Sequence, residues 1–261
     1  MASELEDVRY NVAIANRILA LTGLAIGATA SLGHASLRLP SDPNKFVVKG
    51  RGYAVDALAR INPDQMVVCD TDGNLVDGPP GATQCFEVKM HSSILKTHPN
   101  INSVVHVHPR YVVALSVLQK RLVPMCQEGI QLVRYPLPVW PHTKTVQTDE
   151  EGMEVAELLG DSKVMLFFGH GAAATGVNLI ESVTNMINLE EQAKMNWYAY
   201  CAAGPDHPSI PDEYIDEMIN RPKLWELPQF APHMDPKKPM QVTGVWDYYA
   251  LLAKEQMAAG L

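Results

Sequence analysis

Residues 103–109 read Ser-Val-Val-His-Val-His-Pro, and this stretch is typical of a β-strand that ends at Pro109. Successive side chains of a strand point to opposite faces, so we expect His106 and His108 on one face and the valine on either side of His106 on the other. Proline cannot extend the hydrogen-bonded ladder, so the strand stops just after the second histidine. Two imidazoles side by side at a strand end supply half of a metal site. The alternative is a buried structural histidine beside an exposed one.

A third histidine follows another apolar stretch. Residues 164–168, Val-Met-Leu-Phe-Phe, form an uninterrupted apolar run that is typical of a buried strand. The run leads into Gly169-His170-Gly171, where two glycines remove side-chain bulk on both sides of the imidazole. We therefore expect His170 to reach a cleft at the end of this strand. The alternative is an ordinary histidine in a turn.

Glu87 is the carboxylate expected beside these histidines. Residues 83–97 read as a helix, with Phe86, Met90 and Ile94 at helical spacing as its apolar stripe. Because this helix leads directly into the histidine strand, it is suited to hold a carboxylate over a metal. The alternative is a solvated helix carboxylate, the usual environment of a glutamate.

Lys49-Gly50-Arg51-Gly52 is a candidate anion-binding loop. Its glycines permit a positive φ and expose backbone N–H groups, and its two cations attract a carboxylate or a phosphate. A solvated basic turn explains the same residues, so this loop alone does not decide between the two interpretations.

The remaining pattern alternates helices with strands. Helices are expected at 4–22, 110–118, 149–159, 179–202, 214–219 and 245–257, and strands at 46–48 and 66–70. Eight of the nineteen prolines fall between residues 205 and 239, which predicts a mostly extended segment there. We find no repeat and no clear linker. The prediction is one domain over residues 1–261, with 205–261 as its C-terminal extension.

Composition narrows the class of protein. Of the 261 residues, 47% are hydrophobic and 19% charged, as in a soluble globular protein with a sizeable core. A net charge of −8 argues against a nucleic-acid partner. The acidic first residues do not resemble a signal peptide, and no apolar run is long enough to span a bilayer. The four cysteines are widely spaced, so we expect a cytoplasmic protein with reduced thiols and no membrane partner.

Glu87, then His106-Val107-His108, then Gly169-His170-Gly171 follow the order of motifs in the class II aldolase/adducin superfamily. Gly33-His34-Ala35-Ser36 and the Lys49–Gly52 loop also match, so the chain resembles that superfamily over about residues 8–200. The resemblance implies a three-layer α/β/α fold around a mixed, largely antiparallel sheet. It also implies a four-fold ring, a homotetramer or a multiple of one, with active sites at subunit interfaces.

The same resemblance implies roles for individual residues. His106, His108 and His170 are implied to bind a catalytic divalent metal, and Glu87 to act as the acid/base. Three imidazoles with an open coordination position fit Zn²⁺ or Mn²⁺, and also Fe²⁺ or Co²⁺.

Two departures from the sugar-phosphate aldolases of the superfamily indicate the branch. His34 stands where those enzymes have an asparagine, and Cys85-Phe86 stands where they have two serines. A phosphate needs several hydrogen-bond donors and Phe86 offers none, so a phosphorylated substrate is disfavoured. The cations of the Lys49–Gly52 loop suit a carboxylate instead. The combination is similar to the decarboxylase branch, which acts on hydroxylated aromatic or pyridine dicarboxylates.

The expected substrate is therefore a small hydroxylated aromatic dicarboxylate of the dihydroxyphthalate type. The residues expected to bind it are His34, Ser36, Lys49, Gly50 and Arg51. In the expected reaction the metal acts as a Lewis acid, and Glu87, kept protonated because burial raises its pKa, protonates the ring carbon that loses CO₂.

Two alternatives to this lyase stay open. One is a class II aldolase that cleaves a non-phosphorylated hydroxy acid with the same metal and the same Glu87. The other is an adducin-like binding module without chemistry. The second is disfavoured because a scaffold has no physical need for all three histidines and the glutamate.

Overall fold

One sheet of nine strands runs through the computed structural model, which describes residues 3–233 and 243–261. The strands are β1 (His34–Leu39), β2 (Asp42–Arg51), β3 (Met66–Asp70), β4 (Leu75–Asp77), β5 (Thr83–Gln84), β6 (Ser103–Val107), β7 (Val139–Trp140), β8 (Val164–Phe167) and β9 (Gly171–Gly176). Their order is β4-β3-β2-β1-β6-β9-β8-β7, and β5 pairs with β2. β7 and β8 are parallel, whereas the other pairs are antiparallel. The predicted mixed, largely antiparallel sheet is confirmed.

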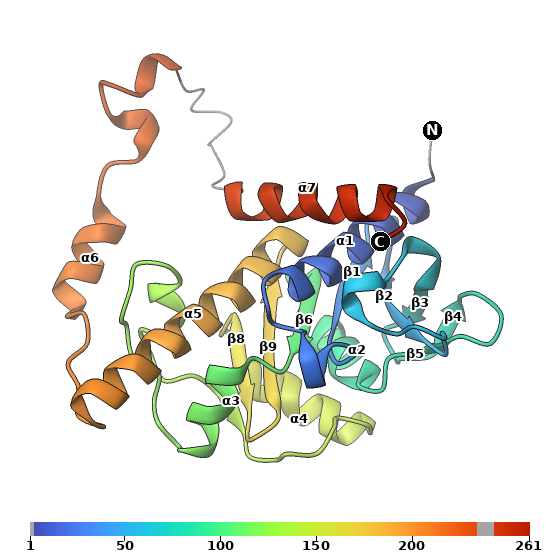
Figure 1. The fold of residues 1–261 in the computed structure, drawn as a ribbon, viewed down its shortest axis with the longest axis horizontal. Helices are drawn as coiled ribbons and strands as arrows, with labels where there is room; N and C mark the ends of the chain where they lie inside the picture. The colour runs from blue at the N-terminus through green and yellow to red at the C-terminus, as the bar shows by residue number, and fades with distance from the viewer. Residues whose placement is uncertain (1–2, 234–242) are drawn as a thin grey trace.

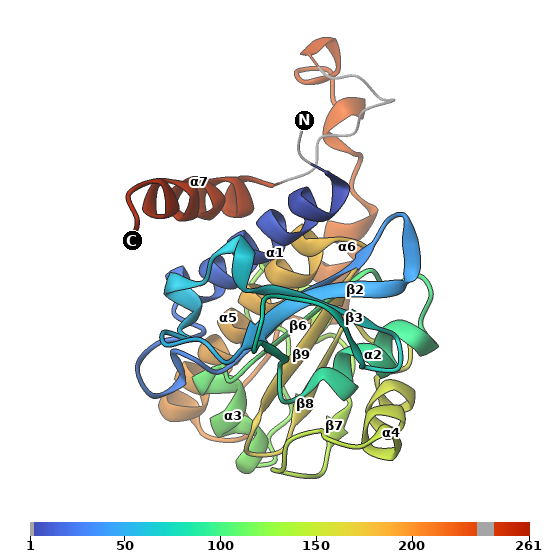
Figure 2. The ribbon, with the colours of Figure 1, turned by 90° about the vertical axis from the view of Figure 1, so that its right-hand side faces the viewer.

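Helices cover both faces of this sheet (Figure 1, Figure 2). On one face lie α1 (Glu4–Leu21), α3 (Arg110–Val117) and α5 (Leu179–Ala203), with α7 (Gly244–Ala258) packed on α1. On the other face lie α2 (Val88–Thr97) and α4 (Asp149–Leu159). Alternate strand residues serve the two layers: Val105 packs in the first core and Val104 in the second. The predicted three-layer α/β/α fold is confirmed.

Capping side chains fix where several helices begin. Ser3 and Glu6 form a capping box at the start of α1, and Thr148 and Glu151 form another at the start of α4. The side chain of Asn178 accepts a hydrogen bond from a backbone N–H at the start of α5. These three helices begin at the residues predicted. Short 3₁₀ helices in the described residues span Gly27–Thr29, Leu58–Arg60, Pro63–Gln65, Ile130–Leu132, Leu224–Glu226 and Ala231–His233.

The helix predicted over residues 83–97 is shorter than expected. Thr83 and Gln84 pair with β2 as strand β5, so the backbone there is extended, and α2 begins only at Val88. Phe86 is consequently outside the helix and 66% exposed, which makes its placement in the core stripe wrong. Met90 and Ile94 are fully buried, as predicted.

The predicted anion-binding loop at residues 49–52 is largely strand. β2 extends to Arg51, and only Gly52 has the positive φ expected of a turn, at 101°. A Cβ atom at Gly50 would lie 2.6 Å from the Tyr53 hydroxyl and 2.9 Å from a backbone carbonyl, so this glycine is required by close packing.

The C-terminal extension leaves the body of the molecule and returns to it (Figure 1). α6 (Asp212–Asn220) buries Ile215, and Arg134 pairs with Asp212 and Asp216 on this helix. α7 lies across α1, and the buried Arg17 guanidinium donates to the carbonyl oxygen of Leu261 at 2.6 Å. Within residues 3–233 and 243–261, no helix combines the length and the apolar character needed to cross a membrane.

Candidate active site

Three histidines and one glutamate converge from three parts of the fold. His106 lies in β6, His108 directly follows this strand, and His170 lies in the turn between β8 and β9. β6 and β9 pair antiparallel, with Val107 opposite Ala172, so the turn before β9 meets the end of β6. The His108 and His170 ring centroids are 4.7 Å apart, and each ring lies 5.1 Å from that of His106. With Glu87, the candidate ligand atoms all lie within 4.8 Å of one another.

Glu87 occupies the N-cap position of α2 and is 5% exposed. Its Oε2 atom lies 3.1 Å from Nε2 of His106 and 3.7 Å from Nε2 of His170. Its Oε1 atom accepts a hydrogen bond from the Val146 backbone N–H at 3.2 Å. The helix entry and the 146 backbone therefore hold the carboxylate against the imidazoles.

The pKa of Glu87 differs from the expectation. Burial alone raises the pKa of this carboxyl, but His106, His170 and the Val146 N–H outweigh burial and lower it to about 2. The expected raised pKa is therefore wrong for this arrangement, because the two imidazoles and the backbone N–H outweigh the effect of burial. Glu87 is ionised at neutral pH.

The donor set fits a divalent metal. Burial first, and then neighbouring charges, lowers the pKa of His108 to about 3, and burial likewise lowers the pKa of His170, so these rings offer neutral lone pairs. Among the described residues, Nδ1 of His106 and Nδ1 of His170 are buried without a hydrogen-bond partner, and Nε2 of His106 has only the Glu87 carboxylate oxygen at 3.1 Å. Unpartnered buried nitrogens are costly, and coordination would satisfy them. Three imidazoles with one carboxylate suit Zn²⁺, Mn²⁺, Fe²⁺ or Co²⁺. Their role as ligands stays a prediction.

His34 lies beside this cluster, and Ser36 lies behind it. Nε2 of His34 is 3.9 Å from Oε2 of Glu87, and its ring stacks on His106 at 5.3 Å. Ser36 is fully buried, and its Oγ lies 2.7 Å from Nδ1 of His91.

His91 is the residue that the sequence interpretation missed. Its Nε2 lies 2.6 Å from Nδ1 of His34, and it is fully buried. Two spacings in the sequence could have indicated His91. It lies four residues after Glu87, which puts both on one face of a helix. Ser36 lies two residues after His34, which puts both on one face of a strand.

His34, Cys85 and His91 also bring candidate ligand atoms within 4.8 Å of one another. However, the two imidazole nitrogens that meet are 2.6 Å apart, whereas two nitrogens on one tetrahedral zinc lie about 3.3 Å apart. Burial also raises the pKa of the Cys85 thiol, which keeps it protonated. These residues therefore form a hydrogen-bonded support rather than a second metal site.

The two predicted anion-binding cations stand beside the cluster but share a carboxylate. Lys49 is buried and pairs with Asp56, and Arg51 lies 3.4 Å from the same side chain. The Arg51 guanidinium also lies 4.1 Å above the Phe86 ring, next to Glu87. Gly50 pairs with Gln84 in the sheet. Their binding of substrate stays a prediction.

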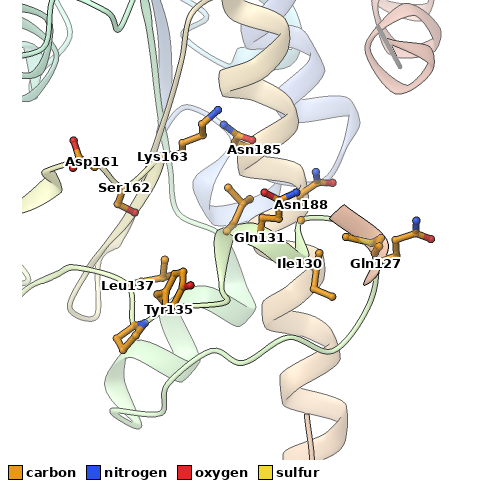
Figure 3. A pocket seen from close by; sticks show the side chains of 14 residues that line it. Gln127, Ile130, Gln131, Tyr135, Leu137, Asp161, Ser162, Lys163, Asn185 and Asn188 are labelled. Carbon is orange, nitrogen blue, oxygen red and sulfur yellow. The ribbon is translucent and has the colours of Figure 1, made fainter. Parts of the chain in front are cut away.

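A cavity of 650 Å³ lies apart from these residues (Figure 3). The carboxamides of Gln127, Gln131, Asn185 and Asn188 line it together with Lys163, which pairs with Glu181. Asn185 donates to the carbonyl oxygen of Thr175, near the opposite end of β9 from His170. None of the residues that line it belongs to the predicted site.

Known proteins resemble this chain in sequence and in fold. The family model described as the Class II Aldolase and Adducin N-terminal domain matches residues 11–197. The chain is 30% identical to 3,4-dihydroxyphthalate decarboxylase of Arthrobacter keyseri over 217 residues, which cover 80% of this chain and 85% of that protein. It is 29% identical to 3-oxo-tetronate 4-phosphate decarboxylase of Escherichia coli K12, over 64% of this chain and 77% of that one. The solved structure of an aldolase II superfamily protein from Pseudomonas syringae superposes with a TM-score of 0.76 at 21% identity, covering 100% of this chain and 96% of that one.

Proposed function

The chain belongs to the class II aldolase and adducin family, and from this premise we propose that it is a metal-dependent carboxy-lyase. Its proposed substrate is a hydroxylated aromatic dicarboxylate of the 3,4-dihydroxyphthalate type, used in aromatic catabolism. The observation that carries the proposal is the group of three histidines around the Glu87 carboxylate, in which Glu87 and His106 are buried and His108 and His170 are half-buried. Burying a carboxylate and an imidazole costs desolvation, which ligation of a metal would offset and which a binding module has no need to bear.

The choice of substrate class is supported by the relatives and by one local feature. Relatives named 3,4-dihydroxyphthalate decarboxylase are 28–30% identical over 77–80% of this chain, and those named 3-oxo-tetronate 4-phosphate decarboxylase are 27–29% identical over 64–77% of it. Phe86 presents an exposed aromatic ring beside Glu87, with Arg51 over one face. Such a surface favours a flat ring with a carboxylate over a sugar phosphate.

In the proposed mechanism His106, His108 and His170 would hold the divalent metal. When bound, the metal supplies Lewis-acid stabilisation of the negative charge that develops as CO₂ leaves. Arg51 and Lys49 orient the remaining carboxylate, and the Phe86 ring excludes water from one side.

Glu87 moves the proton. Loss of CO₂ leaves an electron pair on a ring carbon, and this carbon must gain one proton. Because its low pKa keeps Glu87 ionised beforehand, the carboxylate first takes the proton of a substrate hydroxyl and then delivers it to the ring carbon. The balance is one C–C bond and one O–H bond broken and one C–H bond formed, with no oxidant or reductant. The product is left as a phenolate, which takes a proton from water after release.

We also propose a cytoplasmic homotetramer, or a multiple of one, with active sites at subunit interfaces. All four cysteines are free, two of them buried, which suits a reducing compartment. Val245, Tyr248 and Leu251 on α7 are exposed apolar side chains that a neighbouring subunit would cover. Mass measurement of the native protein tests the assembly, and a monomer would contradict it.

A substrate panel with product analysis tests the reaction. Metal-loaded protein would be incubated with 3,4-dihydroxyphthalate, a sugar-acid phosphate and a non-phosphorylated hydroxy acid, and both CO₂ and aldehyde would be measured. We expect CO₂ from the aromatic substrate alone. Aldehyde from the hydroxy acid would favour the aldolase alternative, and no product from any of them would contradict the lyase assignment.

A further inference from the structure

Another cavity, of 610 Å³, lies where α3 ends beside the edge of the sheet. Its walls come from residues 116–122, 136–141 and 166–168, which are the end of α3, the segment around β7 and the end of β8. β7 is the last strand in the sheet order and pairs in parallel with β8. We call this cavity the edge pocket.

The inner wall of the edge pocket is apolar. Leu122 and Leu166 are buried members of the first core, and the half-buried Leu137 packs against that core. The half-buried Phe168 continues the wall beyond β8. Apolar walls with a few polar groups at the opening are typical of sites for small organic molecules.

The rim of the edge pocket is cationic. Lys120 and Arg121 line it and are exposed, and no aspartate or glutamate is among the lining residues. Within residues 3–233 and 243–261, neither cation forms an ion pair with a carboxylate. The Arg121 guanidinium donates to the carbonyl oxygen of Arg134 at 2.9 Å, which anchors it at the rim. Two neighbouring cations without a counter-ion favour an anionic ligand.

Gln119 adds a polar side chain at a strained position. Its φ of 52° is the only positive φ of a non-glycine residue in the part of the chain that the structure describes. It follows the C-cap residue Leu118 of α3, a position where glycine adopts this φ without strain. Glycine would leave the edge pocket without the Gln119 carboxamide, whose N–H groups can donate to an anion.

We propose that the edge pocket binds a small monocarboxylate with a compact apolar body. The carboxylate lies between Lys120 and Arg121, and the apolar body lies against Leu166 and Phe168. A neutral apolar molecule would leave both cations unused, and a phosphate would leave the apolar wall in water. The inference goes beyond the proposed function and does not depend on it.

The edge pocket adjoins the turn that carries His170, because Oγ of Ser116 in its wall accepts a hydrogen bond from the Gly169 N–H at 3.0 Å. Crystals of metal-free protein soaked in 4-bromobenzoate separate the two places, since anomalous scattering locates the bromine. We expect bromine against Leu166 and Phe168, with the carboxylate at the rim. An edge pocket without bromine would overturn the proposal, whether the probe lies in the candidate active site or a neighbouring subunit fills the pocket.

Calorimetric titration of the metal-free protein with benzoate tests the same site in solution. We expect Lys120→Gln and Arg121→Gln each to weaken binding about two- to fivefold, as for an exposed ion pair. Lys254→Gln on α7 is the matched control, since Lys254 is exposed and lines no part of the edge pocket. Benzyl alcohol, which lacks the charge, should bind more weakly and equally to all four proteins. Equal affinity of the three variants for benzoate would overturn the proposal, and since no reaction is measured, the result is separate from that of the proposed function.

Discussion

At Glu87 two imidazoles and a backbone N–H converge on one buried carboxylate. Burial favours the neutral acid, yet these contacts lower its pKa to about 2. The residue therefore meets its substrate as a base and acts as an acid only after it has taken up a proton. In this order of events, the proton that the ring carbon gains comes from the hydroxyl group of the substrate.

Replacing Glu87 by glutamine tests this role. Glu87→Gln keeps the size and the Val146 hydrogen bond but cannot carry a proton, so we expect CO₂ release to fall by about 10²–10⁴-fold. Metal content, measured by elemental mass spectrometry, should stay close to that of the wild type because the three histidines remain. Nearly full turnover with bound metal would remove Glu87 from the mechanism.

The site residues that could be predicted from the sequence are those whose local spacing alone places their side chains on one face or at one strand end. A strand period of two links His106 to His108, and glycines mark His170. His91 was missed because its role depends on a helix packing against a strand far from it in sequence. Phe86 was misplaced because the pairing of Thr83 and Gln84 with β2 delays the start of α2 until Val88.

The approach of β9 to β6 depends on Gly171. A Cβ atom there would lie 2.5 Å from the Val107 carbonyl oxygen and 3.1 Å from ring atoms of both His106 and His108. We expect Gly171→Ala to reduce metal binding and to lower the free energy of unfolding by about 1–3 kcal/mol, measured by denaturant titration.

Gly244 offers a matched control for that substitution, since a Cβ atom there meets nothing within 4 Å. Gly244→Ala in α7 should leave both measurements unchanged. If Gly171→Ala bound metal as the wild type does, the close packing of the two strands would not be what holds the histidines in place.

The junction of α5 and α3 is expected to make stability depend on pH. Glu190 on α5 accepts hydrogen bonds from the Tyr111 and Val112 N–H groups at the start of α3. Burial raises the pKa of Glu190 from 4.5 to about 7, although these bonds oppose the shift. The folded chain thus holds a proton that the unfolded chain has released, so this contribution is complete below pH 4.5 and is lost as pH rises through about 7.

Glu190→Gln should flatten the pH dependence of the unfolding free energy over that window, measured by chemical denaturation at several pH values. The exposed Glu157 on α4, which is not among the groups that shift Glu190, provides Glu157→Gln as the control. An unchanged pH profile in Glu190→Gln would show that this carboxyl does not titrate there.

Helices were more predictable than strand ends. Capping boxes and a run of apolar residues at a helical period are local signals, and α1, α4 and α5 begin where those signals stand. β2 runs through the segment predicted as a loop because Lys49 pairs with β3, and Gly50 and Arg51 pair with β5. Such pairing is a long-range property that the local sequence does not contain.

At the scale of the whole molecule, the sheet order brings together parts of the chain that are distant in sequence. β6 lies between β1 and β9, so His34, His106 and the turn with His170 share one region of the sheet, and α2 brings Glu87 to it. The C-terminal helix α7 closes over α1 and lies away from that region (Figure 1). The order of the strands thus assembles the site around the central strand β6. A metal bound there would connect the end of β6 with the turn between β8 and β9, beside the start of α2.

Metal-dependent decarboxylation is tested by CO₂ release from 3,4-dihydroxyphthalate before and after removal of metal by a chelator, with ¹³C-labelled carboxyl groups for detection. We expect release to disappear with the metal, to return when Zn²⁺ or Mn²⁺ is added, and not to return in His106→Ala. Full release from protein shown by elemental analysis to be free of metal would rule out a metal-dependent reaction.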